Sequence, residues 1–148
     1  MSARTKARKR AMDMLYNADV LQRPLEQVLS DEQARALNEP ERAASWQYAR
    51  EIITGIIDNG DIIDELISEQ SHDWPLERMP NVDRAILRVG AWEIRFNDQV
   101  PNPVAIAEAI AAATEYSTDD SSRFINGVLG ALADREADRP RSATETND

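Results

Sequence analysis

Apolar residues recur at spacings of three and four along most of the chain, and runs that alternate apolar with polar residues are missing. This period is typical of α-helices that bury one face. The pattern predicts an all-α fold with seven helices. Their expected positions are residues 4–22, 24–37, 42–58, a short segment after Asp61, a segment after Pro80 that ends before Val100, residues 104–115, and residues 118–134.

Two breaks in the pattern separate the central helices. Asn59-Gly60 is a helix-stop signal, so we expect the third helix to end there and a fourth to begin at Asp61. Trp74-Pro75 interrupts the period again before the fifth helix. The sequence therefore predicts two separate helices between residues 42 and 70.

The last two predicted helices carry start signals of their own. Asn102 is the expected N-cap of the sixth helix, with Pro103 at its first position. Thr118 is expected to cap the seventh helix, where Asp119 and Asp120 would complement the helix dipole.

Length and composition fit one compact domain. The chain has 148 residues, enough to bury a sizeable core. We expect residues 1–134 to form the folded domain and residues 135–148 to form a disordered polar tail. No cysteine is present, and no apolar run approaches the roughly 18 residues of a membrane span. These features predict a cytoplasmic protein without a membrane partner.

Positive charge is concentrated at the start of the chain. The first ten residues hold five cations and no acid, whereas the rest carries 12 basic and 27 acidic side chains, for a net charge of -10. Cations in the first turns of a helix oppose its dipole, so helix stability does not explain them. They predict a local site for a polyanion; the alternative is a solvated tail. The cations are Arg4, Lys6, Arg8, Lys9 and Arg10.

Catalytic chemistry finds little support in the sequence. His72 is the only histidine and has no neighbour at metal-ligand spacing. The five glycines are isolated within or beside helices, where close packing or helix termination explains them better than a phosphate loop. Acidic residues cluster at helix starts, as capping alone would favour. We therefore expect no enzyme, no metal site and no cofactor.

Four motifs, taken in order and at their spacing, resemble the NusB family of transcription antitermination factors. The resemblance covers about residues 4–133. The motifs are Arg8-Lys9-Arg10-Ala11 followed by Leu15-Tyr16; Asn81-Val82-Asp83-Arg84-Ala85-Ile86-Leu87-Arg88 with Glu93; Pro103-Val104-Ala105-Ile106-Ala107-Glu108-Ala109; and Ser122-Arg123-Phe124-Ile125-Asn126-Gly127-Val128-Leu129.

The resemblance implies a fold of two small packed helical bundles without catalytic activity. It also implies binding to the boxA element of nascent RNA together with NusE, a protein of the small ribosomal subunit. Such a complex helps RNA polymerase read through terminators in ribosomal RNA operons. The polyanion expected at the basic segment would then be single-stranded RNA, whose phosphates position the strand.

Two residues of the predicted seventh helix are candidates for RNA recognition. Phe124 matches the Phe of the family motif and lies at the edge of an apolar stripe, where its ring would stack on an unpaired base. An ordinary core aromatic is an equally good explanation of Phe124. Asp120, one turn earlier, would accept hydrogen bonds from a base edge.

For a protein partner the resemblance points to Tyr16 and Asp83. Tyr16 projects roughly opposite the apolar stripe of its helix, as interface aromatics tend to do, although packing against a neighbouring helix is an alternative. Asp83 lies in the first turn of its helix, where dipole complementarity also explains it. A second copy of the chain is a further candidate partner.

The chain departs from the family pattern in ways that bear on function. Ala107 stands where relatives commonly have Asn, and Ala113 and Thr114 stand where a Lys is common. Residues 24–46 match no motif.

NusB-like domains also occur fused to ribosomal RNA methyltransferases, but 148 residues leave no room for that enzyme. The remaining alternative is a homodimeric or protein-only adaptor whose basic segment contacts an acidic protein surface.

Overall fold

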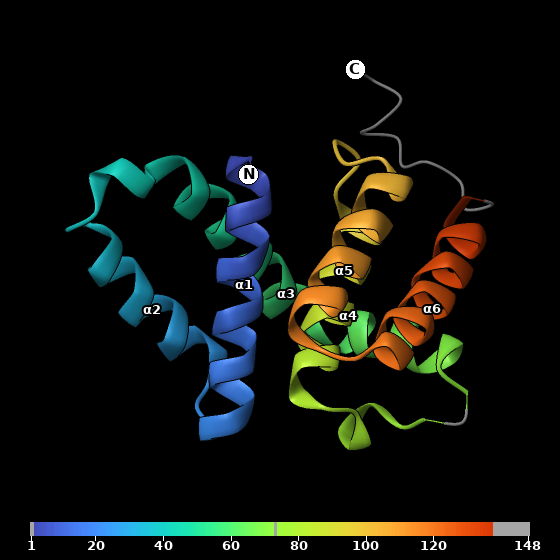
Figure 1. The fold of residues 1–148 in the computed structure, drawn as a ribbon. Helices are drawn as coiled ribbons and strands as arrows, with labels where there is room; N and C mark the ends of the chain where they lie inside the picture. Colours follow the sequence, from blue (N-terminus) through green and yellow to red (C-terminus); the bar gives the residue numbers. More distant parts are fainter. Residues whose placement is uncertain (1, 73, 138–148) are drawn as a thin grey trace.

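The computed structural model describes residues 2–72 and 74–137, and this part of the chain is all-helical, as predicted (Figure 1). It contains six α-helices and two short 3-10 helices and no strand. The elements are α1 (Ala3–Leu21), α2 (Leu25–Ala36), η1 (Pro40–Arg42), α3 (Ala43–Gln70), η2 (Leu76–Arg78), α4 (Asn81–Phe96), α5 (Asn102–Tyr116) and α6 (Asp119–Ala137).

Between residues 42 and 70 two helices were predicted and the structure has one element, α3, but α3 is kinked at Asn59, so the predicted break in the helix is present. Asn59 has non-helical dihedrals (φ -126°, ψ 23°), which marks the kink. Its side-chain amide donates a hydrogen bond to the Gly55 carbonyl, one turn earlier, at 2.9 Å. A side chain thus binds a carbonyl near the kink, and the helix bends where the sequence predicted an end.

The start of α6 follows its predicted signal, whereas the prediction of Asn102 as the N-cap of α5 is wrong by one residue. The Thr118 hydroxyl accepts a hydrogen bond from the Ser121 backbone N–H at 3.0 Å, which confirms it as a cap for α6. The N-cap of α5 is Pro101, so Asn102 is already helical. At its other end α6 continues to Ala137, three residues beyond the predicted domain boundary. The rest of the predicted tail, residues 138–148, lies outside the described residues.

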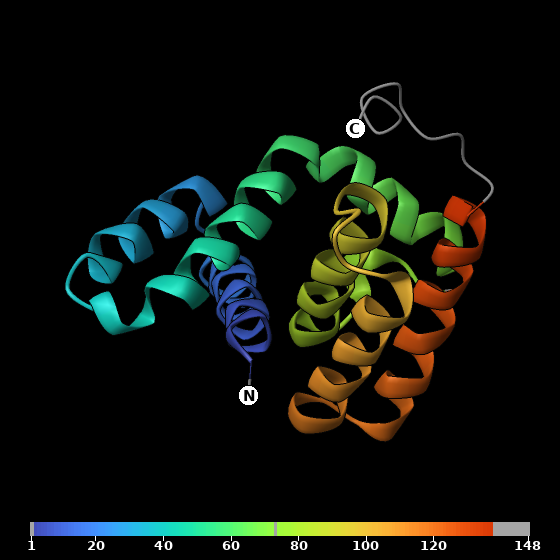
Figure 2. The same ribbon diagram turned by 90° about the horizontal axis from the view of Figure 1, so that it is seen from above.

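The helices fall into two groups that share α3. Figures 1 and 2 show α1, α2 and the first half of α3 on one side of the molecule, and α4, α5 and α6 with the second half of α3 on the other. In both views α5 lies between α1 and α6. The basic segment on α1 and the candidate recognition residues on α6 are therefore separated by α5.

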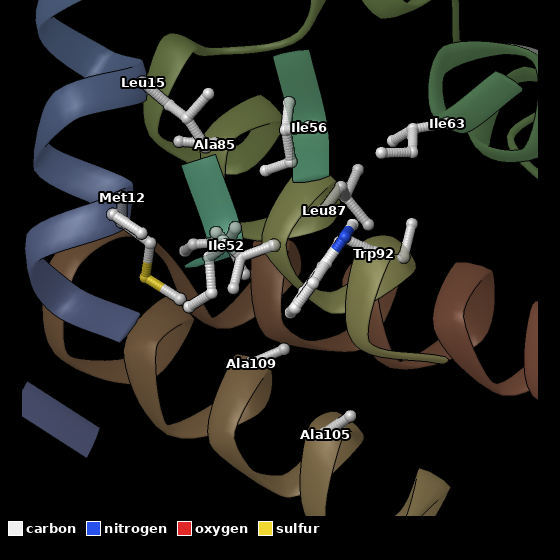
Figure 3. Packing of buried hydrophobic residues seen from close by; sticks show 14 of the residues in the cluster. Met12, Leu15, Ile52, Ile56, Ile63, Ala85, Leu87, Trp92, Ala105 and Ala109 are labelled. Carbon is white, nitrogen blue, oxygen red and sulfur yellow. The ribbon is translucent and has the colours of Figure 1, made fainter. Parts of the chain in front are cut away.

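One hydrophobic core joins the two groups. In Figure 3, Met12 and Leu15 extend from α1 toward Ile52 of α3 and Ala85 of α4. Close approach of α3 and α4 depends on Gly55, because a Cβ atom there would lie 2.0 Å from the indole nitrogen of Trp92. Gly90 allows a similar approach of α4 to α6, where a Cβ would meet Leu129 at 2.7 Å.

Arginines of α4 cross-link three helices at the edge of this core. Arg84 Nε donates to Asp19 of α1 at 2.9 Å. Arg88 donates to Asp64 of α3 at 2.9 and 3.0 Å and to Asp19 at 3.3 Å. These two residues of the second sequence motif therefore hold α4 against α1 and α3.

Candidate nucleic-acid interface

The basic segment forms the first two turns of α1. Ser2 caps the helix by accepting a hydrogen bond from the Thr5 N–H at 3.0 Å, and no acidic residue lies in the first turn. Five cations thus surround a helix start whose own partial charge is positive. Because successive residues of a helix point about 100° apart, these side chains divide between a face that packs on the protein and a face that meets solvent.

Arg8 lies on the packed face and not at the surface. Its side chain is 4% exposed, and its Nε donates to the two carboxylate oxygens of Glu93 at 3.0 and 2.9 Å. Its Nη1 donates to Glu108 at 2.9 Å. The guanidinium is therefore held by two carboxylates, one on α4 and one on α5. Arg8 was predicted to contact RNA phosphates, but in this structure its guanidinium is buried between these two carboxylates, which gives it a structural role.

Tyr48 and Asn97 complete the buried cluster around Arg8. The Tyr48 hydroxyl donates a short hydrogen bond to Glu93, and the Asn97 amide donates to the Tyr48 oxygen at 3.0 Å. Burial raises the pKa of the Glu93 carboxyl, while the Tyr48 hydrogen bond and the Arg8 charge act in the opposite direction. Burial also raises the pKa of the Tyr48 hydroxyl, which therefore stays protonated as a donor.

The sequence did contain a signal for this cluster. Arg8 is spaced three and seven residues from Ala11 and Leu15, which are buried, so it lies on the apolar stripe of α1. Glu93 is spaced four and seven residues from Val89 and Ile86, which are buried, so it lies on the apolar stripe of α4. Opposite charges on two apolar stripes are typical of a buried ion pair, since an unpaired buried charge is costly.

The other four cations of the segment lie at the surface. Lys6 is exposed, and Arg4 donates to Gln99 at 3.3 Å while its guanidinium lies 4.8 Å from the Tyr48 ring centre. Lys9 and Arg10 pair with carboxylates in part-exposed contacts, at 3.1 Å to Asp13 and 3.3 Å to Glu39. Such exposed pairs contribute about 0–1 kcal/mol and exchange readily for a phosphate.

A hollow of about 480 Å³ lies beside this exposed face. Four cations line it, Lys6, Lys9 and Arg10 from α1 and Arg42 from η1, together with the carboxylates Asp13 and Glu41. Arg42 is 60% exposed and forms a 3.3 Å ion pair with Glu39. Sequence analysis missed Arg42, because residues 24–46 match no motif and only the fold brings them beside α1. We call Lys6, Lys9, Arg10 and Arg42 the basic face.

Asp120 and Phe124 lie on the first two turns of α6. The Asp120 side chain is 89% exposed and pairs with Arg123. Phe124 is half-buried and packs on the core at its edge, so it is neither a fully buried core residue nor a free ring. Its ring centre lies 4.8 Å from that of Trp74 in an edge contact with an interplanar angle of 63°. Partial exposure of the Phe124 ring is compatible with stacking on a base and with packing at the edge of the core.

The two candidate partner residues differ in accessibility. Tyr16 is 43% exposed and lines a hollow of about 250 Å³ between α1, α4 and α5, together with Met12, Val82 and Tyr116. Asp83 is fully buried, and it accepts hydrogen bonds from the hydroxyls of two serines at 2.7 Å each. Asp83 was predicted to contact a protein partner, but in this structure its carboxylate is buried and bound within the chain. The two donors are Ser117 and Ser121.

The remaining candidate chemistry is sparse. His72 is exposed in the turn after α3, with a left-handed φ of 26°. Within residues 2–72 and 74–137, no three His, Cys, Asp or Glu side chains are grouped so that they would hold a metal ion. Over the same residues, every helix is too short or too polar to cross a lipid bilayer.

Comparison with known proteins places this geometry in a family. The model of the NusB family matches residues 5–134. The chain belongs to the NusB family. It is therefore a transcription antitermination protein and not an enzyme, as the sequence analysis predicted.

Several relatives are similar over nearly their whole length. The transcription antitermination protein NusB of Leifsonia xyli subsp. xyli is 59% identical over 144 residues, which cover 94% of this chain and all of that protein. The NusB protein of Clavibacter michiganensis subsp. michiganensis is 56% identical over 137 residues, covering 93% of this chain and all of that protein.

Solved NusB structures share the fold. A structure of T. maritima NusB matches with a TM-score of 0.79 and 34% identity, covering 88% of this chain and 90% of that one. The NusB fold also matches a crystal structure of the antitermination factors NusB and NusE in complex with dsRNA, with a TM-score of 0.76 and 22% identity. That match covers 91% of this chain and 98% of the other.

Proposed function

We propose that this NusB-family chain binds boxA-type single-stranded RNA together with NusE in the cytoplasm, and so helps RNA polymerase read through terminators in ribosomal RNA operons. The observation that carries the proposal is the basic face. Four exposed or part-exposed cations surround one hollow on a protein whose net charge is -10. Because the rest of the surface repels a polyanion, RNA is drawn to this place and orientation.

The basic face positions the strand, and Asp120 and Phe124 on α6 read a base. Between them lies α5, whose charged residues, Glu108 and Glu115, are acidic. This helix also carries Ala107 where a polar family residue is common. RNA that reaches from α1 to α6 therefore gains few contacts on the way, and its affinity depends on the two ends.

The hollow beside Tyr16 is the proposed NusE surface. Tyr16 and Tyr116 are both exposed on its rim, and Met12 and Val82 give it an apolar lining. Exposed aromatic rings around an apolar depression are typical of protein interfaces. Lys9 lies 5.0 Å from the Tyr116 ring centre and lines both this hollow and the basic face, so the RNA and NusE surfaces are adjacent.

A binding titration tests the proposal. The affinity of the full chain is measured for a boxA-type RNA and for a scrambled strand of equal length and composition, each with and without NusE. We expect a preference for boxA that NusE strengthens. No binding in either condition contradicts the proposal. Binding to NusE without any preference between the two strands supports the protein-only adaptor instead.

A further inference from the structure

Trp74 lies beside Phe124, although the two residues belong to different elements. Trp74 is in the link between α3 and η2, and Phe124 is on the second turn of α6. Their ring centres are 4.8 Å apart in an edge contact. Both rings are half-buried, so each keeps part of its surface in solvent. Core packing accounts for the buried part of these two rings, and their solvent-facing parts together form a small aromatic patch.

The link that carries Trp74 is fixed at both ends. The Trp74 backbone N–H donates to the Ser71 carbonyl at 2.8 Å, and Ser71 is buried. On the other side Leu76 and Met79 are buried, and Arg84 donates to the Leu76 carbonyl at 2.9 Å. The backbone that carries Trp74 is therefore fixed, and its indole contacts the Phe124 ring without any ligand. Such preorganisation lowers the ordering cost of binding.

The surroundings of the ring pair suit a nucleotide. Arg123, next to Phe124 on α6, is 76% exposed, and Asp120 is one turn earlier on the same helix. Unpaired bases are bound in proteins by aromatic faces, with nearby cations for phosphates and polar groups for base edges. All three kinds of group are present on the first two turns of α6 and the adjoining link.

We propose that Trp74 and Phe124 form one two-ring platform for unpaired bases of the RNA, with Trp74 contributing directly to stacking. This inference rests on the proposed RNA-binding function and adds Trp74 to its contact residues. Recognition by the chain then depends on an aromatic pair that spans the α3–α4 link and α6.

Affinity for boxA-type RNA is measured for Trp74→Leu, Trp74→Phe and Phe124→Leu, with Trp46→Leu as the matched control. Trp46 is also half-buried but lies on α3, outside the ring pair. Loss of one stacked base weakens binding by about 5- to 140-fold, which we expect for Trp74→Leu. Trp74→Phe should keep most of the affinity because it keeps a ring, and Trp46→Leu should bind as the parent chain does.

Tryptophan fluorescence provides a measurement that does not depend on stability. The chain has three tryptophans, and stacking on a base quenches an indole. RNA should quench the parent chain and Trp46→Phe, and most of this quenching should be absent in Trp74→Phe. Two results would overturn the two-ring platform and leave RNA binding intact. One is equal quenching by RNA with and without Trp74. The other is full RNA affinity of Trp74→Leu while Phe124→Leu binds weakly. If the parent chain itself fails to prefer boxA, the proposed function fails.

Discussion

The two faces of the basic segment on α1 both carry cationic side chains, but one face packs inside the protein and the other faces solvent. On the inner face, Arg8 is buried and held by Glu93 and Glu108. On the outer face, Lys6 and Arg10 meet solvent or make part-exposed contacts. A run of cations therefore contains both a structural residue and candidate RNA contacts. Position on the helix, and not charge, separates them.

The largest expected effect comes from breaking the inner face. Arg8→Ala leaves Glu93 buried without its main cation, and removing one partner of a buried ion pair costs about 3–5 kcal/mol. We expect a loss of this size in the free energy of unfolding, measured by chemical denaturation. Lys6→Ala, two residues away and exposed, is the matched control and should change stability little. Equal stability of both variants would contradict the division into two faces.

Phe124 provides the next test, because stacking and core packing predict different results. Phe124→Ala should weaken RNA binding by about 1–3 kcal/mol if its ring stacks on a base. The salt dependence of binding should stay the same, since no phosphate contact is removed. A fully buried Phe would instead cost about 3–5 kcal/mol of stability on truncation. A variant that melts much earlier but binds RNA normally when folded excludes stacking.

Asp83 shows the same division on α4. Its carboxylate accepts hydrogen bonds from Ser117 and Ser121, so it joins α4 to the start of α6. Asp83→Ala leaves these two hydroxyls without their acceptor and should lower stability by about 1–3 kcal/mol. NusE binding by the folded variant should be unchanged. A stable variant with weakened NusE binding would restore Asp83 as an interface residue.

A smaller effect is expected in the pH dependence of the Arg8→Ala variant. Burial already raises the pKa of Glu93 in the folded chain, and Arg8 opposes that rise. Without Arg8 the folded pKa rises further above the unfolded value. Stability is then greatest where Glu93 is protonated in both states and falls as the pH rises through the folded pKa. As the pH rises above the ordinary range of a carboxyl pKa, denaturation midpoints should fall more steeply than in the parent chain; parallel curves would contradict this account of Glu93.

Much of the fold was predictable from the sequence because helix periodicity and caps are local signals. Thr118 was found by its position alone, and the core stripes of α1 and α4 follow from spacing. The break at Asn59 was also predicted, but the sequence did not show that both halves belong to one kinked helix, in which the Asn59 amide binds the Gly55 carbonyl. A local signal states that the helix is disturbed there, but the tertiary packing decides whether it ends.

The candidate site was less predictable because it joins distant segments. Arg42 reaches the basic face only through the α2–α3 connection, and Trp74 reaches Phe124 only through packing of the link on α6. The buried ion pair of Arg8 could have been predicted from the spacing of Arg8 to Ala11. The charge composition of the segment alone did not indicate it. Residue type indicated the kind of ligand, and the fold was needed to assign the contacts.

The salt dependence of boxA RNA binding tests the outer face most directly. The parent chain is compared with the triple variant Lys6→Ala, Lys9→Ala and Arg10→Ala, and a thermal melt confirms that the variant is folded. Each lost phosphate contact lowers the magnitude of the log–log salt slope by about 0.7, so three lost contacts predict a decrease of roughly 2 with similar stability. An unchanged slope in the folded triple variant would contradict the account and place the RNA elsewhere.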